Sequence, residues 1–243
     1  DLHPANRRQR QMCIRDRLES LEFFFQDIGE SKYRAKQVIK WIHQKGVIDF
    51  YKMTNLNKKL IEKLNTIAFI KPPTIEDQFI SDEGTKKYLI KLHSGSMIEM
   101  VVIPEGKRRT LCVSSQAGCA LQCTFCATGA QGFDQNLESD EIIGQLWLAN
   151  FSEKSKKPIT NVVFMGMGEP LLNFDAVIEA TKIIKDQNAY GLSRKRITIS
   201  TSGIVPNIKK LNKHVDVSLA ISLHAANDEL RDKIVPILSL IHI

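Results

Sequence analysis

The chain of 243 residues is long enough for one large domain, or for a small domain followed by most of a larger one. Hydrophobic residues make up 43% of it and charged residues 25%, as in an ordinary globular protein, and no apolar run approaches the ~20 residues of a transmembrane helix, which excludes a membrane-spanning protein. The formal net charge of +7 favours a polyanionic partner. Five cysteines, three of them clustered, are typical of a reducing compartment, so we expect a cytoplasmic protein.

Both ends of the chain differ in composition from the rest. Residues 1–17 contain five arginines against two aspartates, which is +3 of the +7, and no helical or strand period runs through them. Together with residues 238–243 they resemble translated sequencing debris more than protein. We therefore expect a non-native leader and a non-native tail. Subtracting +3 from +7 leaves +4, a modest basic bias.

The first predicted unit is a small helical domain over residues 18–70. Hydrophobic residues recur at helical spacing over residues 18–28, 31–44 and 57–65, which predicts three amphipathic helices. Lysines and arginines occupy the outer faces of these helices. They form either a solvated surface over a small core or a surface that binds RNA, and the charge alone favours neither interpretation.

Two prolines at residues 72–73 mark the end of this domain, because they cannot continue a helix. Residues 74–80, 86–92 and 97–103 then have the composition of strands separated by short turns. We expect an antiparallel meander that occupies residues 71–109 and leads into the next unit.

Strands and helices alternate over residues 110–237. The predicted elements, beginning with a strand, cover residues 110–114, 140–151, 161–165, 174–187, 196–200, 207–211, 215–223 and 228–235. Alternating β and α units imply a parallel sheet. The sequence therefore predicts an α/β fold in which about four βα units form part of a (β/α) barrel, and in such barrels the chemistry gathers at the carboxyl ends of the strands.

Three cysteines, Cys119, Cys123 and Cys126, lie at C-x-x-x-C-x-x-C spacing on one short loop bounded by glycines. Thiolates select iron–sulfur clusters, zinc or cuprous ion, and a structural zinc site takes four protein ligands. A [4Fe–4S] cluster held by three cysteines has one iron without a protein ligand, which suits catalysis. The alternative is a zinc knuckle or a chance grouping, but no Cys or His pair elsewhere has the spacing to complete a zinc site.

The loops after the other predicted strands are also polar. Residues 165–170 read Met-Gly-Met-Gly-Glu-Pro, where glycines let a ligand approach the backbone and Glu169 offers a carboxylate to an ammonium group. Residues 200–203 offer hydroxyls to a carboxylate, and residues 222–227 include His224. Serine-rich turns and single histidines are commonly structural, so it is their shared position at one rim of the barrel that favours a ligand site.

The cysteine spacing resembles the signature of the radical S-adenosylmethionine (SAM) enzymes, and five further segments narrow the resemblance. They are residues 112–119, 132–133, 161–173, 200–203 and 221–225. They closely resemble the RlmN-type dual-specificity RNA methyltransferases, and the resemblance covers about residues 18–236. It implies a (β/α)6 radical SAM barrel, a [4Fe–4S] cluster, SAM, and methylation of carbon 2 of one adenine in large-subunit ribosomal RNA. In many bacteria the family also methylates an adenine beside the transfer RNA anticodon.

Carried over residue by residue, the resemblance gives a role to each candidate site residue. The cluster ligands would be Cys119, Cys123 and Cys126, and the SAM-binding residues would be Gly168, Glu169, Ser200, Ser222, Leu223 and His224. Glu99 matches the glutamate that accepts the carbon 2 proton, and Cys112 matches the cysteine that closes a transient disulfide. Without the resemblance, Glu99 would be interpreted as an outward strand residue and Cys112 as a small buried hydrophobe.

The implied mechanism needs a radical because carbon 2 of adenine is electron-poor, and it needs an unpaired or extruded adenine. A methylated protein cysteine carries the methyl group. In the family that cysteine lies near the carboxyl end of a longer chain, and this sequence has no cysteine after Cys126. We therefore expect activity of the intact gene product, inactivity of these 243 residues, and an open sheet edge with exposed apolar side chains.

Two other functions remain open. One is a Cfr-like methyltransferase that acts on carbon 8 of the same adenine and confers antibiotic resistance, and the other is a non-catalytic iron–sulfur or RNA-binding module. As partners of the enzyme we expect ribosomal RNA, transfer RNA and an electron donor such as flavodoxin, with no membrane contact and a monomeric state.

Overall fold

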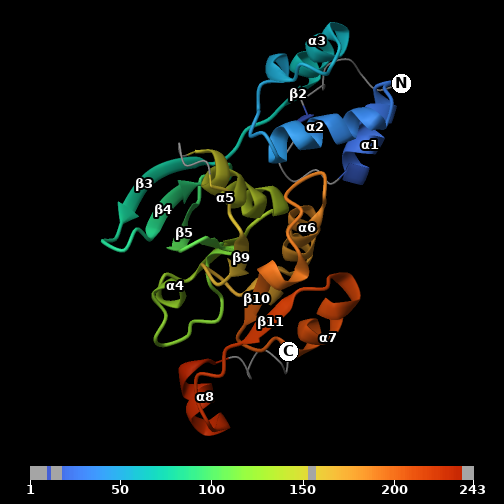
Figure 1. The fold of residues 1–243 in the computed structure, drawn as a ribbon. Helices are drawn as coiled ribbons and strands as arrows, with labels where there is room; N and C mark the ends of the chain where they lie inside the picture. Colours follow the sequence, from blue (N-terminus) through green and yellow to red (C-terminus); the bar gives the residue numbers. More distant parts are fainter. Residues whose placement is uncertain (1–9, 12–17, 153–156, 237–243) are drawn as a thin grey trace.

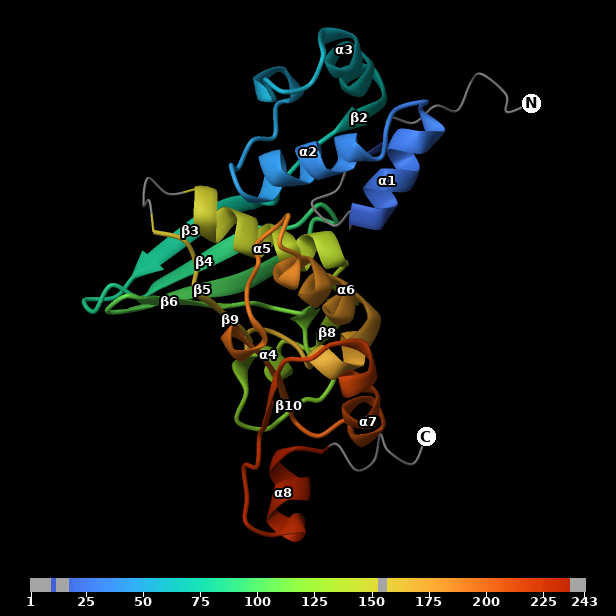
Figure 2. The ribbon, with the colours of Figure 1, turned by 45° about the vertical axis from the view of Figure 1, so that its right-hand side comes forward.

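The computed structural model describes residues 10–11, 18–152 and 157–236. They form a helical domain, a seven-stranded sheet and helices packed around the sheet (Figures 1 and 2). Apart from residues 10–11, the expected leader lies outside the described residues, and so does the expected tail, residues 238–243. None of the helices in the described part of the chain is long and apolar enough to cross a membrane.

The first unit has the three helices that the sequence predicts. Its elements are α1 (Leu18–Asp27), α2 (Tyr33–His43), the 3-10 helix η2 (Phe50–Lys52), α3 (Lys58–Ile67) and β2 (Ala68–Phe69), which pairs in parallel with β1 (Arg10–Gln11). Helix α2 begins at Tyr33, and Ser31 Oγ accepts a hydrogen bond from the Tyr33 N–H (3.3 Å). Asn57 Oδ1 accepts from the Leu60 N–H (2.8 Å), which caps α3. Apolar side chains from the three helices fill one core between them.

Seven strands form one sheet with an antiparallel half and a parallel half. The strands are β3 (Thr74–Ile80), β4 (Lys86–Lys91), β5 (Met97–Glu105), β6 (Arg108–Cys112), β9 (Asn161–Phe164), β10 (Ile197–Thr201) and β11 (Ser218–Ile221), in the spatial order β11-β10-β9-β6-β5-β4-β3. Strands β3 to β6 pair antiparallel, whereas β6, β9, β10 and β11 pair in parallel. Strand β6 belongs to both halves, so the meander extends the sheet of the partial barrel and is not a separate layer.

The four parallel strands are those of the four predicted βα units, and β11 forms the edge of the sheet. Its pairing with β10 covers only Ser218–Ile221, so the strand is shorter than the predicted 215–223. Leu219 is 40% exposed and Ile221 is 60% exposed. Among the residues that the structure describes, no strand pairs with the outer side of β11, so this edge is open and partly apolar, as expected from the sequence.

The helices that follow the strands are α5 (Ser139–Phe151), α6 (Phe174–Lys185), α7 (Val205–His214) and α8 (Asp228–Ile234). Helices α5 and α6 pack side by side against the sheet (Figure 2). Helix α5 begins one residue before the predicted 140–151, and its N-cap is Glu138, because Glu141 Oε2 accepts a hydrogen bond from the Glu138 N–H (3.0 Å) in a capping box. Helix α7 is longer than predicted because Pro206 fits the first turn of a helix.

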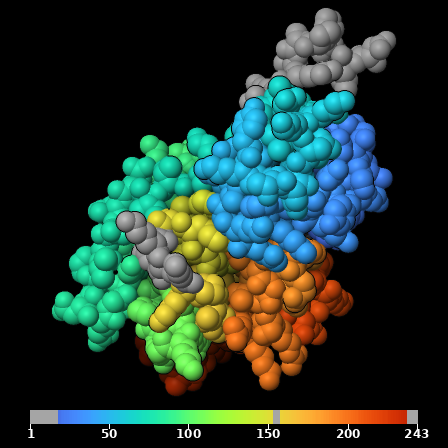
Figure 3. All heavy atoms as spheres, turned by 45° about the horizontal axis from the view of Figure 1, so that its top comes forward, coloured from blue at the N-terminus to red at the C-terminus, as the bar shows by residue number. Residues whose placement is uncertain are grey.

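The helical domain packs against α5 and the chain after α6 (Figure 3). Trp147 Nε1 donates to the Ile42 carbonyl (3.0 Å), and His43 Nδ1 lies 3.1 Å from the Tyr190 hydroxyl. At Gly46 a Cβ would lie 2.5 Å from the Phe151 ring, so only glycine fits there. Helix α5 is buried almost all round because it lies between the sheet and this domain.

Candidate active site

The loops that follow the four parallel strands line one cavity of about 340 Å³, a size within the ~300–1,000 Å³ common for small-molecule sites. Its lining comprises Cys119, Cys123, Cys126, Gly168, Glu169, Ser200, Ser222 and His224, together with Leu121, Phe125, Thr128, Phe164, Met165, Gly166, Pro170, Thr201 and Ser202. The structure thus brings together every residue that the resemblance gives to the cluster or to SAM except one. Leu223 is 70% exposed and lies outside this lining.

The cysteine loop is closed by a short hairpin that sequence patterns are too weak to predict. Strand β7 (Gln116–Gly118) pairs with β8 (Phe133–Asn136), and the short helix α4 (Ala127–Ala130) follows the last cysteine. The Cys119 N–H donates to the Gly132 carbonyl (2.9 Å). Gly118 has a φ of +71°, and a Cβ on it would lie 1.9 Å from that same carbonyl oxygen, so the loop closes only with glycine at this position.

The three thiols influence one another electrostatically. Burial raises the pKa of Cys119 and of Cys123, and the charges of the neighbouring cysteines raise both pKa values further. Thiolates gathered in this way are stabilised by a positively charged cluster. The three thiols line one cavity, and thiolates are the soft donors that an iron–sulfur cluster takes, so the donor set fits such a cluster.

Glu169 joins the loops after β9 and β10. Its carboxylate is buried and accepts hydrogen bonds from the Leu171 N–H (3.0 Å, to Oε1) and the Ser202 N–H (2.8 Å, to Oε2). Burial raises the pKa of Glu169, and these two hydrogen bonds oppose the increase. Hydrogen bonds from the Thr201 and Ser202 side chains act in the same direction on this pKa. Because Glu169 also lines the cavity, its carboxylate both joins the two loops and is placed where a ligand ammonium group could bind.

The glycines of residues 165–170 are required by the packing of their loop. A Cβ at Gly166 would lie 2.7 Å from the Val113 carbonyl oxygen, and one at Gly168 would lie 2.4 Å from the Gln116 side chain. The loop therefore packs against the end of β6 and the start of the cysteine loop. Both glycines also line the cavity, and the expectation that they let a ligand approach the backbone stays a prediction.

The loop after β11 adds a strained backbone. His224 has a φ of +61°, and its ring lies 4.7 Å from the Phe125 ring of the cysteine loop, centroid to centroid. Gln122, with a φ of +51°, is the other non-glycine residue in the left-handed region among the residues described. Both belong to loops around the cavity, and such strain is common at functional sites. The Ser222 N–H donates to the Thr201 carbonyl (2.9 Å), which fixes the position of this loop relative to the end of β10.

Glu99 and Cys112 lie outside the cavity lining. Glu99 is half-exposed on β5, and its Oε1 lies 3.0 Å from Lys87 Nζ on β4, where strand pairing places the two side chains diagonally on one face. Cys112, at the end of β6, is a free thiol among the described residues. Burial raises the pKa of Cys112 to about 11, against the effect of a backbone hydrogen bond at Met165. The resting thiol is therefore protonated near neutral pH.

Four polar residues that we did not select from the sequence hold the site together. Gln145 of α5 binds both backbone groups of Ser114, accepting from its N–H (2.8 Å) and donating to its carbonyl (2.9 Å). Ser114 Oγ donates to the Glu99 carbonyl (2.6 Å) and accepts from the Met167 N–H (2.8 Å). Gln116 Oε1 accepts from the Glu169 N–H (2.9 Å).

The fourth is Asn173, which donates to the carbonyls of Ser115 (2.8 Å) and Leu137 (2.7 Å). All four are buried polar residues. Only Ser114 and Gln116 lie at the end of a predicted strand, whereas Gln145 lies inside helix α5 and Asn173 just before α6, and no local signal indicates their partners because those are far away in the sequence.

Comparison with known proteins agrees with this architecture. The family model described as "Ribosomal RNA large subunit methyltransferase N-terminal domain" matches residues 16–70, and that of the Radical SAM superfamily matches residues 113–239. A solved structure, a radical SAM methyltransferase from Sphaerobacter thermophilus, superimposes with a TM-score of 0.88 at 36% identity, covering 95% of this chain and 69% of that one.

Curated relatives are more similar in sequence. The dual-specificity RNA methyltransferase RlmN of Pseudomonas putida strain F1 is 59% identical over 222 residues, which is 89% of this chain and 58% of the relative. The protein of the same name from Pseudomonas entomophila is 57% identical over 225 residues, 90% of this chain and 59% of the relative. The chain thus spans less than two thirds of the length of these relatives. Because the matches cover the helical domain and the sheet alike, and the cysteine triad lies in the loop after the first parallel strand, the chain belongs to the radical SAM superfamily and, within it, to the RlmN-like proteins.

Proposed function

We propose that the full-length protein is a SAM-dependent RNA methyltransferase that modifies carbon 2 of an adenine in large-subunit ribosomal RNA and of an adenine beside the anticodon of transfer RNA. One observation carries the proposal: three cysteines line the same cavity as the Glu169 carboxylate and the hydroxyls of Ser200 and Ser222. The identity of 59% to an RlmN protein supports the choice of carbon 2.

Two groups of residues divide the cavity in this proposal. Cys119, Cys123 and Cys126 would hold a [4Fe–4S] cluster, and the loops with Glu169 and His224 would hold SAM. When bound, the cluster and SAM supply one-electron chemistry, which electron-poor carbon 2 needs because it does not attack a sulfonium methyl group as a nucleophile. The role of the chain is to orient SAM through the carboxylate and hydroxyls and to exclude water.

Outside the cavity, Glu99 accepts the proton that leaves carbon 2. Cys112, as a thiolate, attacks the sulfur of the methyl-carrying cysteine, and a disulfide forms as the bond from that sulfur to the transferred carbon breaks. The electron pair of the broken bond goes to the transferred carbon, which takes up a proton to become the methyl group. The methyl carrier is not among these 243 residues, which contain no cysteine after Cys126. The proposal therefore concerns the protein expressed from the complete gene.

We further propose that the protein acts in the cytoplasm as a monomer, without membrane contact, and receives electrons from a donor such as flavodoxin. Clustered thiols support a reducing compartment, because an oxidising one would pair them. The modest basic bias of +4 that remains without residues 1–17 is compatible with a nucleic acid as partner.

The test is a methylation assay with cluster-loaded full-length protein, a ribosomal RNA fragment or transfer RNA, a reductant and SAM, followed by mass spectrometry of the digested nucleosides. We expect 2-methyladenosine. Cys123→Ala should abolish reductive SAM cleavage, whereas Glu99→Gln should keep cleavage and lose the methylated base. Glu105→Gln is the matched control, because Glu105 lies on the same strand and is exposed.

Other results would redirect the proposal. Formation of 8-methyladenosine would make the protein a Cfr-like carbon 8 methyltransferase. RNA binding without SAM cleavage in the cluster-loaded protein would leave only an iron–sulfur or RNA-binding module.

A further inference from the structure

The helical domain carries a second pocket, of about 260 Å³. Its lining comprises Tyr33, Lys36, Gln37, Lys40, Trp41, Gln44 and Lys45 of α2 and the turn after it, with Asn55 from the chain before α3. None of these residues lines the active-site cavity, and in Figure 1 the helical domain lies at the opposite end of the molecule from α8. The pocket is therefore separate from the active-site cavity.

One face of α2 provides the chemistry of this pocket. Tyr33, Lys36 and Lys40 are spaced by three and four residues, so their side chains lie along the same side of the helix. Like charges at positions i and i+4, as at Lys36 and Lys40, slightly destabilise an isolated helix, and an anion bound between them would relieve this repulsion. Among the described residues that line the pocket none is acidic, and this face remains positively charged.

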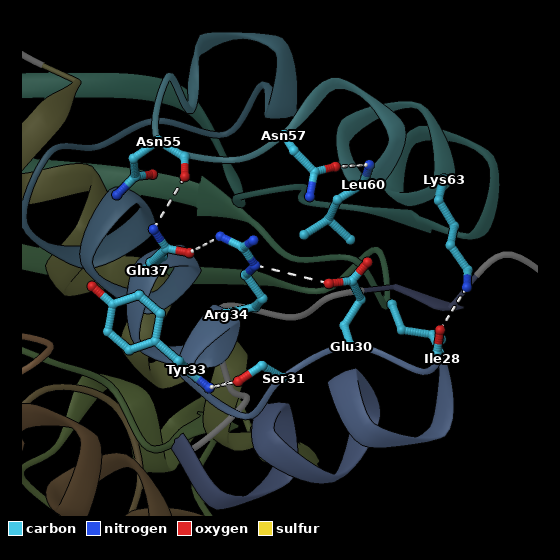
Figure 4. Close-up of polar contacts among 10 residues, drawn as sticks. All are labelled: Ile28, Glu30, Ser31, Tyr33, Arg34, Gln37, Asn55, Asn57, Leu60 and Lys63. Carbon is cyan, nitrogen blue, oxygen red and sulfur yellow. Dashed lines mark hydrogen bonds and ion pairs between the residues drawn. The ribbon is translucent and has the colours of Figure 1, made fainter.

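A chain of polar contacts holds Gln37 and Asn55 of the pocket in place. Glu30 Oε2 lies 3.8 Å from Arg34 Nε, Arg34 Nη1 donates to Gln37 Oε1 (2.8 Å), and Gln37 Nε2 donates to the Asn55 carbonyl (3.1 Å), a chain of contacts drawn in Figure 4. The nearby acid, Glu30, is thus paired with Arg34. Gln37 is only 9% exposed and uses both ends of its amide. Asn55 is therefore held in place beside α2.

Two aromatic rings complete the pocket. Tyr33 is 62% exposed, although it is a large apolar ring next to three lysines. Trp41 Nε1 donates to Asn55 Oδ1 (2.6 Å), and Lys45 Nζ lies 3.7 Å from the centroid of the Trp41 ring. This cation–π contact holds the ammonium group at the pocket edge. The exposed Tyr33 ring is therefore available to stack with a flat ligand.

We propose that this pocket binds one unpaired nucleotide of the substrate RNA, with its base stacked on Tyr33 and its flanking phosphates beside Lys36 and Lys40. Exposed aromatic rings interleaved with cations are the elements by which proteins bind single-stranded nucleic acid. The charge of the pocket complements phosphate, and the amide of Asn55 is placed to meet a base edge. This inference rests on the proposed function, which supplies the identity of the substrate. It gives the helical domain a role in binding the RNA at a position away from the reacting adenine.

The test measures binding of a short fluorescein-labelled single-stranded oligoadenylate to the full-length protein by fluorescence anisotropy at several salt concentrations. We expect Tyr33→Ala to raise Kd about five-fold or more, and Tyr33→Phe to bind like the wild type because it keeps the ring. Lys40→Gln should weaken binding and reduce the slope of log K against log salt by about 0.7, the loss of one phosphate contact on a single strand.

Tyr51→Ala is the matched control, since Tyr51 is 66% exposed in the same domain and does not line the pocket. The proposal is overturned if Tyr33→Ala binds as tightly as Tyr51→Ala. It is also overturned if a polyglutamate peptide displaces the oligonucleotide equally well from the wild type and from Tyr33→Ala, because the surface is then only cationic and suited to an acidic protein.

The proposal for this pocket and the proposed function can be rejected independently of each other. Binding that depends on Tyr33 in a protein that forms no methyladenosine supports the pocket and rejects the methyltransferase. Methyladenosine formation together with binding that is indifferent to Tyr33 and Lys40 rejects the pocket and keeps the methyltransferase.

Discussion

The Cys112 thiol illustrates how burial at a single residue controls reactivity. At the end of β6 it loses contact with water, and its pKa rises from the ordinary value of 9.0 to about 11. Only the thiolate is nucleophilic, so a thiol in this state resists adventitious alkylation and oxidation. In the proposed reaction, Cys112 must lose its proton only after the methyl carrier and the base are in place.

We predict that Cys112 reacts with iodoacetamide about 100-fold more slowly at pH 7.5 than an unperturbed thiol, because two pKa units correspond to a hundredfold smaller thiolate fraction. The rate should rise with pH until about pH 11. Mass spectrometry of the Cys112 peptide from cluster-loaded protein measures it, and urea-unfolded protein provides the reference. A midpoint near pH 8.5 in the folded protein would contradict the prediction.

The structure shows that Glu99 forms an ion pair with Lys87, which the sequence did not indicate. The two side chains are about half-exposed, at 49% and 44%, so their ion pair adds little to stability. Its effect is instead on position, since the ammonium group at 3.0 Å limits the orientations of the carboxylate. Proton transfer depends on such orientation.

We therefore predict that Lys87→Met lowers kcat several-fold while the melting temperature stays within about 2 °C of the wild type. Lys91→Met is the control, because Lys91 is an exposed lysine on the same strand and forms no ion pair with Glu99 that the structure records. Unchanged kcat in Lys87→Met would show that Glu99 needs no partner.

At the scale of elements, the cysteine loop depends on the β7–β8 hairpin. Two of the three glycines of this hairpin have positive φ, +71° at Gly118 and +79° at Gly132. Only Gly118 is also crowded, since its Cβ position lies against the Gly132 carbonyl, whereas nothing lies within 4 Å of the Cβ position at Gly132. Substituting each of these two glycines by alanine therefore distinguishes the cost of backbone strain, present at both, from that of a steric clash, present only at Gly118.

We predict that Gly132→Ala costs roughly 1–2 kcal/mol, the cost of the left-handed conformation for alanine, and keeps the cluster. Gly118→Ala should in addition open the hairpin, break the hydrogen bond from Cys119 to Gly132, and lose most of the iron. Iron content per chain and thermal unfolding measure the two effects. Equal iron content in both variants would mean that the hairpin is not needed to hold the triad.

At the scale of the whole molecule, a buried histidine joins the helical domain to the barrel. His43 packs edge-on against the Tyr190 ring, with centroids 5.0 Å apart, and its Nδ1 lies 3.1 Å from the Tyr190 hydroxyl. Burial lowers the pKa of His43 to about 3 and raises the pKa of Tyr190. The interface therefore requires both rings to be neutral.

This interface predicts acid sensitivity. Above pH 6.5 His43 is neutral in both states, but below it the unfolded chain binds a proton that the folded protein takes up only near pH 3. Stability should fall by about 1.4 kcal/mol per pH unit as the pH decreases from 6.5 towards 3. Urea unfolding followed by tryptophan fluorescence measures this, since Trp41 and Trp147 lie on the two sides of the interface.

His43→Gln should lose this part of the pH dependence, and His93→Gln, at an exposed turn, should keep it. A pH dependence that is the same in all three proteins would mean that His43 takes up a proton in the folded state.

The sequence by itself determined the order of the helices and strands and the chemistry of the cluster site. Hydrophobic periods, prolines and glycines are local, so α1, α3, β3 and the four parallel strands were predictable to within a few residues. The spacing of Cys119, Cys123 and Cys126 is local as well, and it limits the ligand to a few soft metals or clusters without any knowledge of the fold.

Tertiary structure alone decided how these parts meet. The meander joins the barrel sheet because β6 pairs with β5 on one side and with β9 on the other, across nearly fifty residues of chain. Gln145, Lys87 and His43 gain their roles from partners elsewhere in the fold, and Gly166 and Gly168 turn out to serve packing. The periodicity of a segment depends on that segment alone, so it can be recognised in the sequence. A tertiary contact depends on two distant segments, which only folding brings together.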